Sequence, residues 1–331
     1  RLLILILILN FSINKLFAAD IPIIVISAGK TYQSKSIVGS DVVVVDSKAI
    51  SESNEFFLGE LLSKNLNGMN YFQQGGTGTV SGIQLRGLPK KYSTVYVDGV
   101  KMSDPSTPDN AYYFNNLMTG SLDRIEILKG TQTSLYGGGA LAGTVNIFSK
   151  KGRDGHNKNI GVSTGSRGTK NLNISFDGKQ ENYDYFLEFT NFSTDGQSAM
   201  IDNDENDRYR NDSITANMGY NINDVLRVEN YLRYSDYFLE YDEVDADNLP
   251  DDNNTDDQEA SYSGRLIIDN GNLKNTLFYN KTIFQRNVNN YSGASILKDN
   301  FKSERNAINL LGEYNFNLDT KIVYGLDNEF D

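Results

Sequence analysis

The stretch that decides the fold runs from residue 123 to residue 148. Asp123–Gly130 read DRIEILKG and Gly143–Phe148 read GTVNIF, with a glycine-rich connection between them. Short runs of aliphatic residues that are bounded by glycine are typical of strands. We therefore expect two strands of one compact unit here.

Upstream residues extend this unit to about residue 41. Val42–Val45 is a continuous apolar run of the kind found in buried strands. Ser51–Glu55 offers N-cap candidates for a helix, because Phe57, Leu58, Leu61 and Leu62 follow at helical spacing. Ile83–Gly87 and Ser93–Val100 are further strand candidates, the second interrupted by an Asp-Gly turn. Residues 41–151 therefore predict a small mixed α/β domain.

A different pattern begins beyond Lys151. Strand-length segments alternate between apolar and polar residues, as in Tyr183–Thr190, Ile214–Ile222 and Leu226–Tyr234. One apolar face and one charged face is the pattern of a transmembrane β-barrel, whose strands need about 9–11 residues to cross the bilayer. A soluble β-sandwich would give the same alternation, although strands of this length are uncommon in sandwiches.

The connections between these segments also alternate. Asn221–Asp224 and Asp269–Asn272 have the composition of tight turns. The stretches Thr194–Arg210, Glu240–Glu259 and Arg286–Asp299 are long and polar, and we expect them to be loops. Short turns on one side and long loops on the other are typical of an outer-membrane barrel.

The first residues have the features of an export signal. Arg1 precedes an unbroken run of eight Leu and Ile residues, and Ala18-Ala19 follow as small residues. The apolar run is too short for an ordinary spanning helix. We expect residues 1–19 to be a cleaved signal peptide, and an uncleaved anchor or a lipid-surface helix is the alternative. Residues 20–40 are expected to hold an extended apolar segment and a linker.

Composition excludes several classes of function. The 331 residues carry a net charge of -12, with one His and no Cys. Disulfides and thiolate metal sites are therefore excluded, and the negative charge argues against a nucleic-acid partner. Gly76 and Gly78 lack the third glycine, the lysine and the helix of a phosphate loop. We predict no enzyme activity and no catalytic residues.

The order and spacing of these motifs resemble the TonB-dependent outer-membrane receptors. The first signature of that family is similar to Gly75–Gly78, Ile83–Gly87 and Val95–Val100, and the second is similar to Asp123–Gly130 with Ser134–Gly137 and Ala142–Ile147. Thr131 departs from the family, which usually has Pro there. The resemblance implies a plug domain over residues 41–151, followed by a barrel over residues 152–331.

The resemblance also implies the rest of the barrel. Plugged transporters of this type have 22 strands, and about nine are readable here. We therefore expect this sequence to be the first part of a longer protein, clipped at both ends. An open barrel would leave strand edges that lipid cannot satisfy.

The resemblance assigns roles to several residues of the plug. Arg86, Arg124 and Glu126 would form a charged latch between the plug and the barrel. Ile23, Ile24, Val25, Ile26, Ser27 and Ala28 are similar to the TonB box, an extended segment that adds a strand to the sheet of the TonB protein. A simple edge strand is the alternative interpretation of that segment.

Within the family the likeness is greatest to the cobalamin receptors. Substrate contacts at the plug apex would then come from Val80, Gly82, Pro89, Thr107 and Pro108. Acidic residues of two loops resemble a calcium site, and the ligands would be Asp202, Asp204, Tyr241 and Asp242. Calcium prefers six to eight oxygen ligands, so converging carboxylates suit it. A solvated acidic loop, or one bridged by divalent ions to lipopolysaccharide, is the alternative.

The substrate is open between several classes. A cobalamin or another corrinoid is favoured by the loop likeness, whereas a ferric siderophore or other metal chelate would share every plug feature. A passive porin or an adhesin needs neither plug signatures nor a TonB box. The expected location is the outer membrane of a Gram-negative cell, among lipid and lipopolysaccharide.

Overall fold

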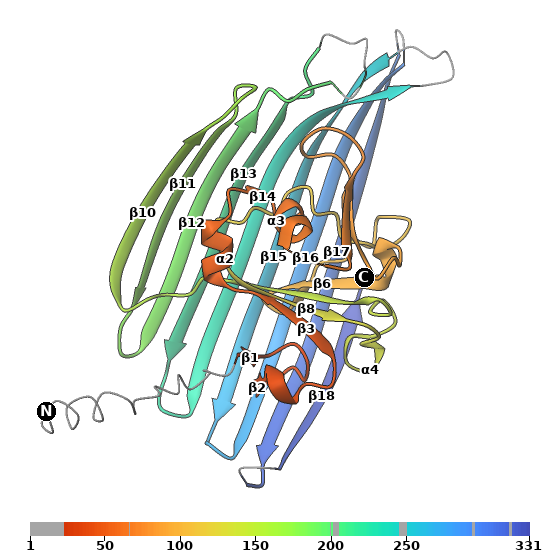
Figure 1. Cartoon of the computed structure of the whole chain (residues 1–331). Coiled ribbons are helices and arrows are strands. Elements are labelled where there is room, and N and C mark those ends of the chain that lie inside the picture. Colours follow the sequence, from red (N-terminus) through yellow and green to blue (C-terminus); the bar gives the residue numbers. More distant parts are fainter. Residues whose placement is uncertain are drawn as a thin grey trace, which may run out of the picture.

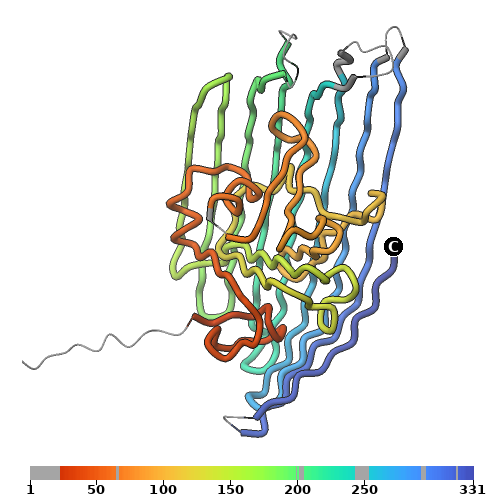
Figure 2. The backbone as a smooth tube through the Cα atoms, turned by 45° about the vertical axis from the view of Figure 1, so that its right-hand side comes forward, coloured from red at the N-terminus to blue at the C-terminus, as the bar shows by residue number. Residues whose placement is uncertain are grey.

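The computed structural model describes residues 23–65, 67–198, 200, 205–244, 250–292, 295–317 and 320–331. The expected signal peptide at residues 1–19 lies outside the described residues. Two bodies make up the described chain: a small domain at the N-terminal side, and a large curved sheet that holds this domain on its concave face (Figures 1 and 2).

The small domain is built on a five-stranded sheet. Its order is β3 (Asp41–Val45), β8 (Leu122–Lys129), β9 (Gly143–Ser149), β6 (Ser93–Val97) and β7 (Val100–Lys101). β6 and β9 run parallel, and the other neighbours run antiparallel. The two strands expected in residues 123–148 are therefore confirmed as β8 and β9, which are neighbours in this sheet, with β9 at its centre.

Smaller elements surround this sheet. They are the hairpin β4 (Met69–Gln73) with β5 (Ser81–Leu85), the pair β1 (Ile24–Val25) with β2 (Gln33–Ser34), the helices α2 (Ser47–Glu52), α3 (Leu58–Asn65) and α4 (Thr133–Tyr136), and the short 3-10 turns η1 (Lys35–Ile37) and η2 (Lys90–Tyr92). None of the described helices combines the length and the apolar character needed to cross a bilayer.

The helix expected after Ser51–Glu55 is confirmed as α3, whose Leu58, Leu61 and Leu62 are fully buried. The predicted capping segment is partly wrong, since its first two residues end another helix. The Asp46 carboxylate caps that helix, α2, by accepting the Ala49 N–H at 2.9 Å. The first N–H groups of a helix have no acceptor within the helix, so a carboxylate at the N-cap satisfies one of them.

The large sheet contains nine described strands, each antiparallel to the next in chain order. They are β10 (Gly155–Thr164), β11 (Lys170–Lys179), β12 (Tyr183–Thr194), β13 (Tyr209–Asn221), β14 (Leu226–Val244), β15 (Pro250–Asp269), β16 (Leu273–Ser292), β17 (Ser295–Asn315) and β18 (Lys321–Phe330). The fold is thus an α/β plug with an antiparallel sheet of the barrel type, as the sequence predicts.

Two of the expected loops are largely strand instead. Glu240 pairs with Asn254, and Asn289 pairs with Lys298, so the hairpins continue through the polar stretches. A ladder needs only backbone hydrogen bonds, so it persists where both faces are polar and hydrophobicity gives no signal. The described residues between Thr194 and Tyr209 belong to neither neighbouring strand, as expected of a loop, and both tight turns are confirmed.

The alternation predicted for the large sheet is observed. On β12, Leu187 and Phe189 are exposed on the convex face, whereas Phe186 and Glu188 are buried against the small domain. On β13, Met218 is 55% exposed. The large sheet also contributes Tyr231 and Phe284 to the main apolar core of the small domain. The two bodies therefore share one core.

Candidate ligand cavity and plug contacts

A cavity of about 580 Å³ lies where loops of the small domain meet the upper ends of β14–β17. It is lined on one side by residues of the stretches 74–80 and 104–115. On the other side it is lined by aromatic side chains of the large sheet, including Tyr237, Tyr241, Phe284 and Phe301. Its volume falls within the range of small-molecule sites.

Two of the five predicted substrate contacts, Val80 and Pro108, line this cavity. The other three are not among the lining residues. Gly82 lies within β5, and Pro89 precedes η2. The Thr107 hydroxyl donates to the Asp104 carbonyl at 2.8 Å and is buried. Substrate contact by all five stays a prediction.

The glycine-rich loop is shaped by a close approach to the large sheet. Gly78 has a φ of +88°, and a Cβ on it would lie 2.0 Å from the ring of Tyr209. Only glycine adopts this backbone without strain and leaves room for the ring. The Asn115 amide donates to the Gly78 carbonyl at 3.1 Å, and the Tyr209 hydroxyl donates to the Asn115 carbonyl at 2.9 Å. The loop is therefore fixed from two sides.

The second apex loop is organised by Asp104. Its carboxylate accepts the N–H and the hydroxyl of Ser106, both at 2.8 Å, and the hydroxyl of Ser303 at 2.7 Å. Arg286 completes the arrangement, with an ion pair to Asp104 at 3.5 Å and a hydrogen bond to the Ser106 hydroxyl at 2.8 Å. This loop is consequently tied to β16 and β17.

A buried ion pair anchors the small domain below the cavity. Arg233 and Glu259 are 3% and 2% exposed at the side chain and pair with each other. Glu259 accepts the Asn116 amide at 2.9 Å, while Arg233 donates to the Asn116 carbonyl at 3.1 Å. Buried charges are tolerated only when paired and hydrogen-bonded. Asn116 therefore links the small domain to β14 and β15.

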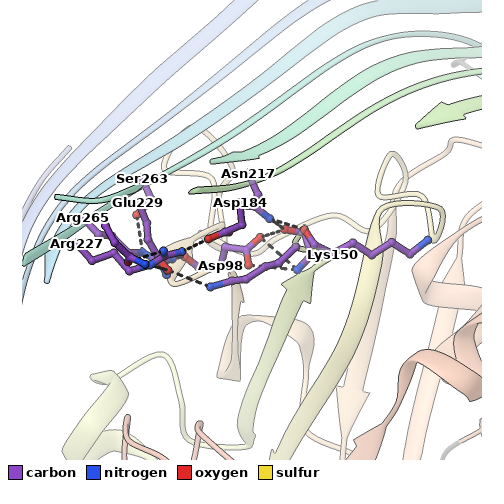
Figure 3. A network of polar contacts seen from close by, with 11 residues as sticks. Asp98, Lys150, Asp184, Asn217, Arg227, Glu229, Ser263 and Arg265 are labelled. Carbon is purple, nitrogen blue, oxygen red and sulfur yellow. Dashed lines mark hydrogen bonds and ion pairs between the residues drawn. The ribbon is translucent and has the colours of Figure 1, made fainter. Parts of the chain in front are cut away.

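A second polar network lies lower on the interface and centres on Asp98 (Figure 3). The β6–β7 turn holds Asp98 at φ 46°, and its carboxylate accepts the Ser149 N–H at 3.2 Å. The Asp98 carbonyl accepts from Arg265, which lies 3.5 Å from Glu229. Burial raises the pKa of Asp98 above its usual range. The predicted Asp-Gly turn is confirmed, and it serves as a contact point.

Other side chains extend this network along the interface. Glu229 also pairs with Arg227 at 2.9 Å and with Lys151 at 3.3 Å. The Asn217 amide donates to the Ser149 hydroxyl and to the Lys150 carbonyl. Residues from β13, β14 and β15 thus hold the end of β9 (Figure 3).

The N-terminal segment of residues 23–34 docks at the opposite end of the sheet from the cavity. Val25 is fully buried beside Val42 and Leu128. The buried carboxylate of Glu126 accepts the N–H of Ile26 at 3.0 Å and the N–H of Ser27 at 2.8 Å. The segment expected to act as a TonB box is therefore packed against β8.

Tyr136 and the large sheet hold the same segment. The Tyr136 hydroxyl donates to the Ser27 carbonyl at 2.6 Å. Lys30 pairs with Asp327 of β18 at 3.0 Å, and Lys321 donates to the Thr31 hydroxyl at 2.9 Å. The segment thus has contacts with both bodies.

The three residues of the predicted latch make other contacts in the described chain. Arg86 pairs with Asp41 at 3.6 Å, within the plug. Arg124 lies 3.0 Å from the second oxygen of Glu126, an ion pair without hydrogen-bond alignment, and it donates to the Ile24 carbonyl at 3.4 Å. Two latch residues therefore hold the N-terminal segment, and their contact with lumenal charges stays a prediction.

The barrel-side partners in the described contacts between plug and sheet are residues that no sequence motif marks. They include Arg265, which contacts Asp98, and Arg233 and Glu259, which contact Asn116. Their separations along the chain exceed a hundred residues, so no local pattern reveals them. The alternation of apolar and polar residues in Leu226–Tyr234 indicates only that Arg233 lies on the face of the strand that is turned away from lipid.

Of the predicted calcium ligands, Asp202 and Asp204 lie outside the described residues. Asp242 forms an acidic cluster with Glu205 and Asp207, whose nearest carboxylate oxygens all lie within 4.8 Å of one another. Asp242 also accepts the Ser198 hydroxyl at 2.7 Å. Tyr241 lines the cavity, and its hydroxyl donates to Asn290 at 3.2 Å.

Comparisons with known proteins define the class. Residues 34–144 match the model of the TonB-dependent receptor plug domain. A small plug domain on the concave face of an antiparallel sheet is the arrangement of a plugged outer-membrane barrel. Residues 34–144 are therefore a plug domain of the TonB-dependent receptor family, and the strands after them form a sheet of the matching barrel type.

Within that family the sequence is similar to vitamin B12 transporters. It is 29% identical over 152 residues to BtuB of Vibrio cholerae, covering 46% of this chain and 24% of that protein. BtuB of Vibrio vulnificus strain CMCP6 is 26% identical over 152 residues, which again cover 46% of this chain and 24% of that protein. The chain spans about a quarter of the length of these relatives.

Solved receptors share the fold. The ferric yersiniabactin uptake receptor FyuA of Yersinia pestis aligns with a TM-score of 0.70 at 16% identity, over 88% of this chain and 48% of that chain. The ferripyoverdine receptor of Pseudomonas aeruginosa aligns with a TM-score of 0.74 at 13% identity, over 93% and 44%. At these identities the likeness concerns the fold alone.

Proposed function

We propose that this protein takes part in TonB-dependent uptake of a large, scarce nutrient across the outer membrane, and that the nutrient is cobalamin or another corrinoid. The observation that carries the proposal is the arrangement of three features. The plug lies on the concave face of the sheet, a ligand-sized cavity lies at one end, and an extended segment docks at the other. β16 connects the two ends, since Phe284 lines the cavity and Lys274 lies 6.0 Å from the Tyr32 ring.

The convex face of the sheet supports a membrane location. Its exposed side chains include Leu187, Phe189, Ile214, Met218, Leu232, Leu266, Leu277 and Ile308. An apolar outer face with polar residues toward the interior suits a barrel wall in lipid. Export through a cleaved signal, and contact with lipopolysaccharide, belong to the same proposal.

The N-terminal segment is the proposed partner site. Ile23–Ala28 includes extended residues rich in β-branched side chains, and such a segment adds readily to a partner's sheet edge. TonB, driven by its inner-membrane complex, is the proposed partner. A protein of this kind transports its ligand without chemical change, so we propose no catalytic activity.

Cobalamin is favoured by the sequence similarity to vitamin B12 transporters, which extends over 152 residues. A ferric siderophore is the second candidate, because the structural neighbours include receptors named for such chelates. Calcium binding is proposed at the acidic cluster of Glu205, Asp207 and Asp242, whose clustered carboxylate oxygens suit a hard cation.

Deletion of residues 23–28 in the full-length gene tests the proposal. We expect energised uptake of labelled cobalamin to be lost while binding at the cell surface is kept. A matched deletion in the loop at residues 166–168, which joins β10 and β11, should leave uptake intact. Unchanged uptake after loss of residues 23–28 would refute the TonB-box assignment.

A further inference from the structure

We infer that the cavity at the plug apex selects against ligands that carry a net negative charge and accepts neutral or cationic, donor-rich ones. The inference rests on the proposed function, because it takes this cavity to be the substrate site. It adds that the net charge of the ligand decides the affinity, so that neutral corrinoids and cationic chelates bind more tightly than anionic ferric chelates.

The charges of the described cavity wall are mostly negative. Acidic side chains are contributed by Asp104, Asp207, Asp242, Asp257 and Glu259, whereas Arg286 is the one cation among the described lining residues. Asp104 and Glu259 are paired with Arg286 and Arg233, so the excess of acidic groups comes from the other three. An anionic ligand that enters such a cavity loses its hydration and meets charges of its own sign. Recognition of carboxylate or catecholate groups usually depends on available guanidinium or ammonium donors.

The single cation among the described lining residues is already engaged. Arg286 lies 3.5 Å from the Asp104 carboxylate and donates to the Ser106 hydroxyl at 2.8 Å. Its guanidinium also lies 5.6 Å from the centre of the Phe301 ring. To bind an anion, Arg286 would have to leave a loop that it helps to hold in place.

Neighbouring cations are engaged as well. Arg233, below the cavity, is buried and pairs with Glu259. Lys90 pairs with Asp109 at 3.0 Å and lies 4.1 Å from the centre of the Tyr113 ring. Both of these described cations therefore have a carboxylate partner within the protein.

A bound divalent cation would not reverse this balance. The cluster of Glu205, Asp207 and Asp242 brings three carboxylates together. Two positive charges on a calcium ion leave one negative charge in excess when all three are ionised. The wall would remain unfavourable to anions even with the proposed calcium in place.

The remaining wall explains which ligands suit the cavity. Tyr237, Tyr241, Phe284 and Phe301 offer flat apolar surface for a large ring system. Carboxylates and tyrosine hydroxyls accept hydrogen bonds, so they favour ligands with amide or amine donors at the edge. A neutral macrocycle with amide side chains, or a cationic chelate, meets both requirements.

The test measures equilibrium binding to the full-length receptor, purified in detergent, with two pairs of probes. The first pair is cyanocobalamin and its monocarboxylic acid, in which one amide side chain is hydrolysed. The second pair is a cationic ferric trihydroxamate and an anionic ferric tris-catecholate. In the pair that binds, we expect the affinity of the anionic probe to be lower than that of its partner by about tenfold or more. The reason is that unit charges several ångströms apart interact strongly in a partly buried site. Added salt should narrow the difference.

A substitution that adds a cation sharpens the test. Val288 lines the cavity, is partly buried and lies on β16 two residues beyond Arg286. We expect Val288→Lys to strengthen binding of the anionic probe by about tenfold, whereas Val288→Met, a neutral control, should not. If Val288→Lys leaves anion binding unchanged, or if the unmodified receptor binds the anionic probe as tightly as its partner, the inference is wrong.

The outcomes also separate this inference from the proposed function. Tight binding of the anionic tris-catecholate, with TonB-dependent uptake of that probe, would overturn the inference about ligand charge and leave the transport proposal standing. No binding of any of the four probes would overturn both.

Discussion

Ser27 is joined to the buried carboxylate of Glu126 by two hydrogen bonds, from its N–H at 2.8 Å and from its hydroxyl at 2.6 Å. β1 is at the same time paired with β2. Strand addition to a partner requires free backbone groups. The segment at residues 23–28 must therefore undock from Glu126 before it can pair with another protein.

The first prediction concerns this undocking. Hydrogen bonds to a charged group contribute about 1.5–3 kcal/mol, so Ser27→Ala should raise the undocked population by about tenfold or more. These 331 residues contain no Cys, and Val25 is fully buried. A thiol introduced as Val25→Cys should react faster with a maleimide when Ser27→Ala or Tyr136→Phe is added.

The control for the thiol experiment is Ser51→Ala. The Ser51 hydroxyl donates to the Lys48 carbonyl at 2.9 Å in an exposed helix and does not contact the segment. The Val25→Cys reaction rate should not change with this substitution. Equal rates in all variants would show that the Glu126 contacts do not hold the segment.

The second prediction concerns the glycine-rich loop. Gly78→Ala forces a positive φ on alanine and places its Cβ against the Tyr209 ring. We expect the loop to shift, at a cost of about 1–3 kcal/mol, and cobalamin affinity to fall in a titration of the full-length receptor. Gly138→Ala is the control, because a Cβ on Gly138 would meet no atom of the described chain within 4 Å. Equal affinities would mean that this loop does not shape the cavity.

The third prediction concerns the buried pair of Arg233 and Glu259. Arg233→Met leaves the Glu259 carboxylate buried without its cation, and such losses cost about 3–5 kcal/mol. The thermal unfolding midpoint of the full-length receptor should fall. The double variant Arg233→Met with Glu259→Leu should recover much of the loss, since neither charge remains. A double variant as unstable as the single one would contradict the account.

The fourth prediction concerns pH. Burial raises the pKa of Asp98 in the folded protein, so the folded state binds this proton more tightly than the unfolded state does. The carboxyl group therefore favours folding most at low pH, and that contribution is lost as pH rises through the folded pKa. Asp98→Asn cannot ionise, so its unfolding midpoint relative to the parent should rise as the pH increases from the ordinary carboxyl range through the raised pKa of Asp98. A difference that is independent of pH would contradict this.

Much of the fold can be predicted from the sequence because its signals are local. The glycine-bounded strands of the plug and the alternation of β12–β14 need only a few neighbouring residues. The upper parts of β14–β17 escape prediction, since a ladder with polar residues on both faces has the composition of a loop. Glu240–Glu259 illustrates this, as does Arg286–Asp299.

The candidate site is predictable to a smaller degree. The family resemblance points to Val80 and Pro108, which line the cavity, whereas no local pattern marks Arg286 and Tyr237. Their positions depend on the register of β14–β17 and on how the plug is oriented. The hydrogen bond from Ser27 of the N-terminal segment to Glu126 is likewise not predictable, because the two residues are about a hundred positions apart in the sequence.

TonB-dependent uptake is the central claim, and one measurement tests it most directly. Cells that express the full-length gene are given labelled cobalamin, with TonB present or deleted, and both surface-bound and internal label are counted. The account predicts equal surface binding in the two strains and internal accumulation only where TonB is present. Equal accumulation in the absence of TonB would contradict it.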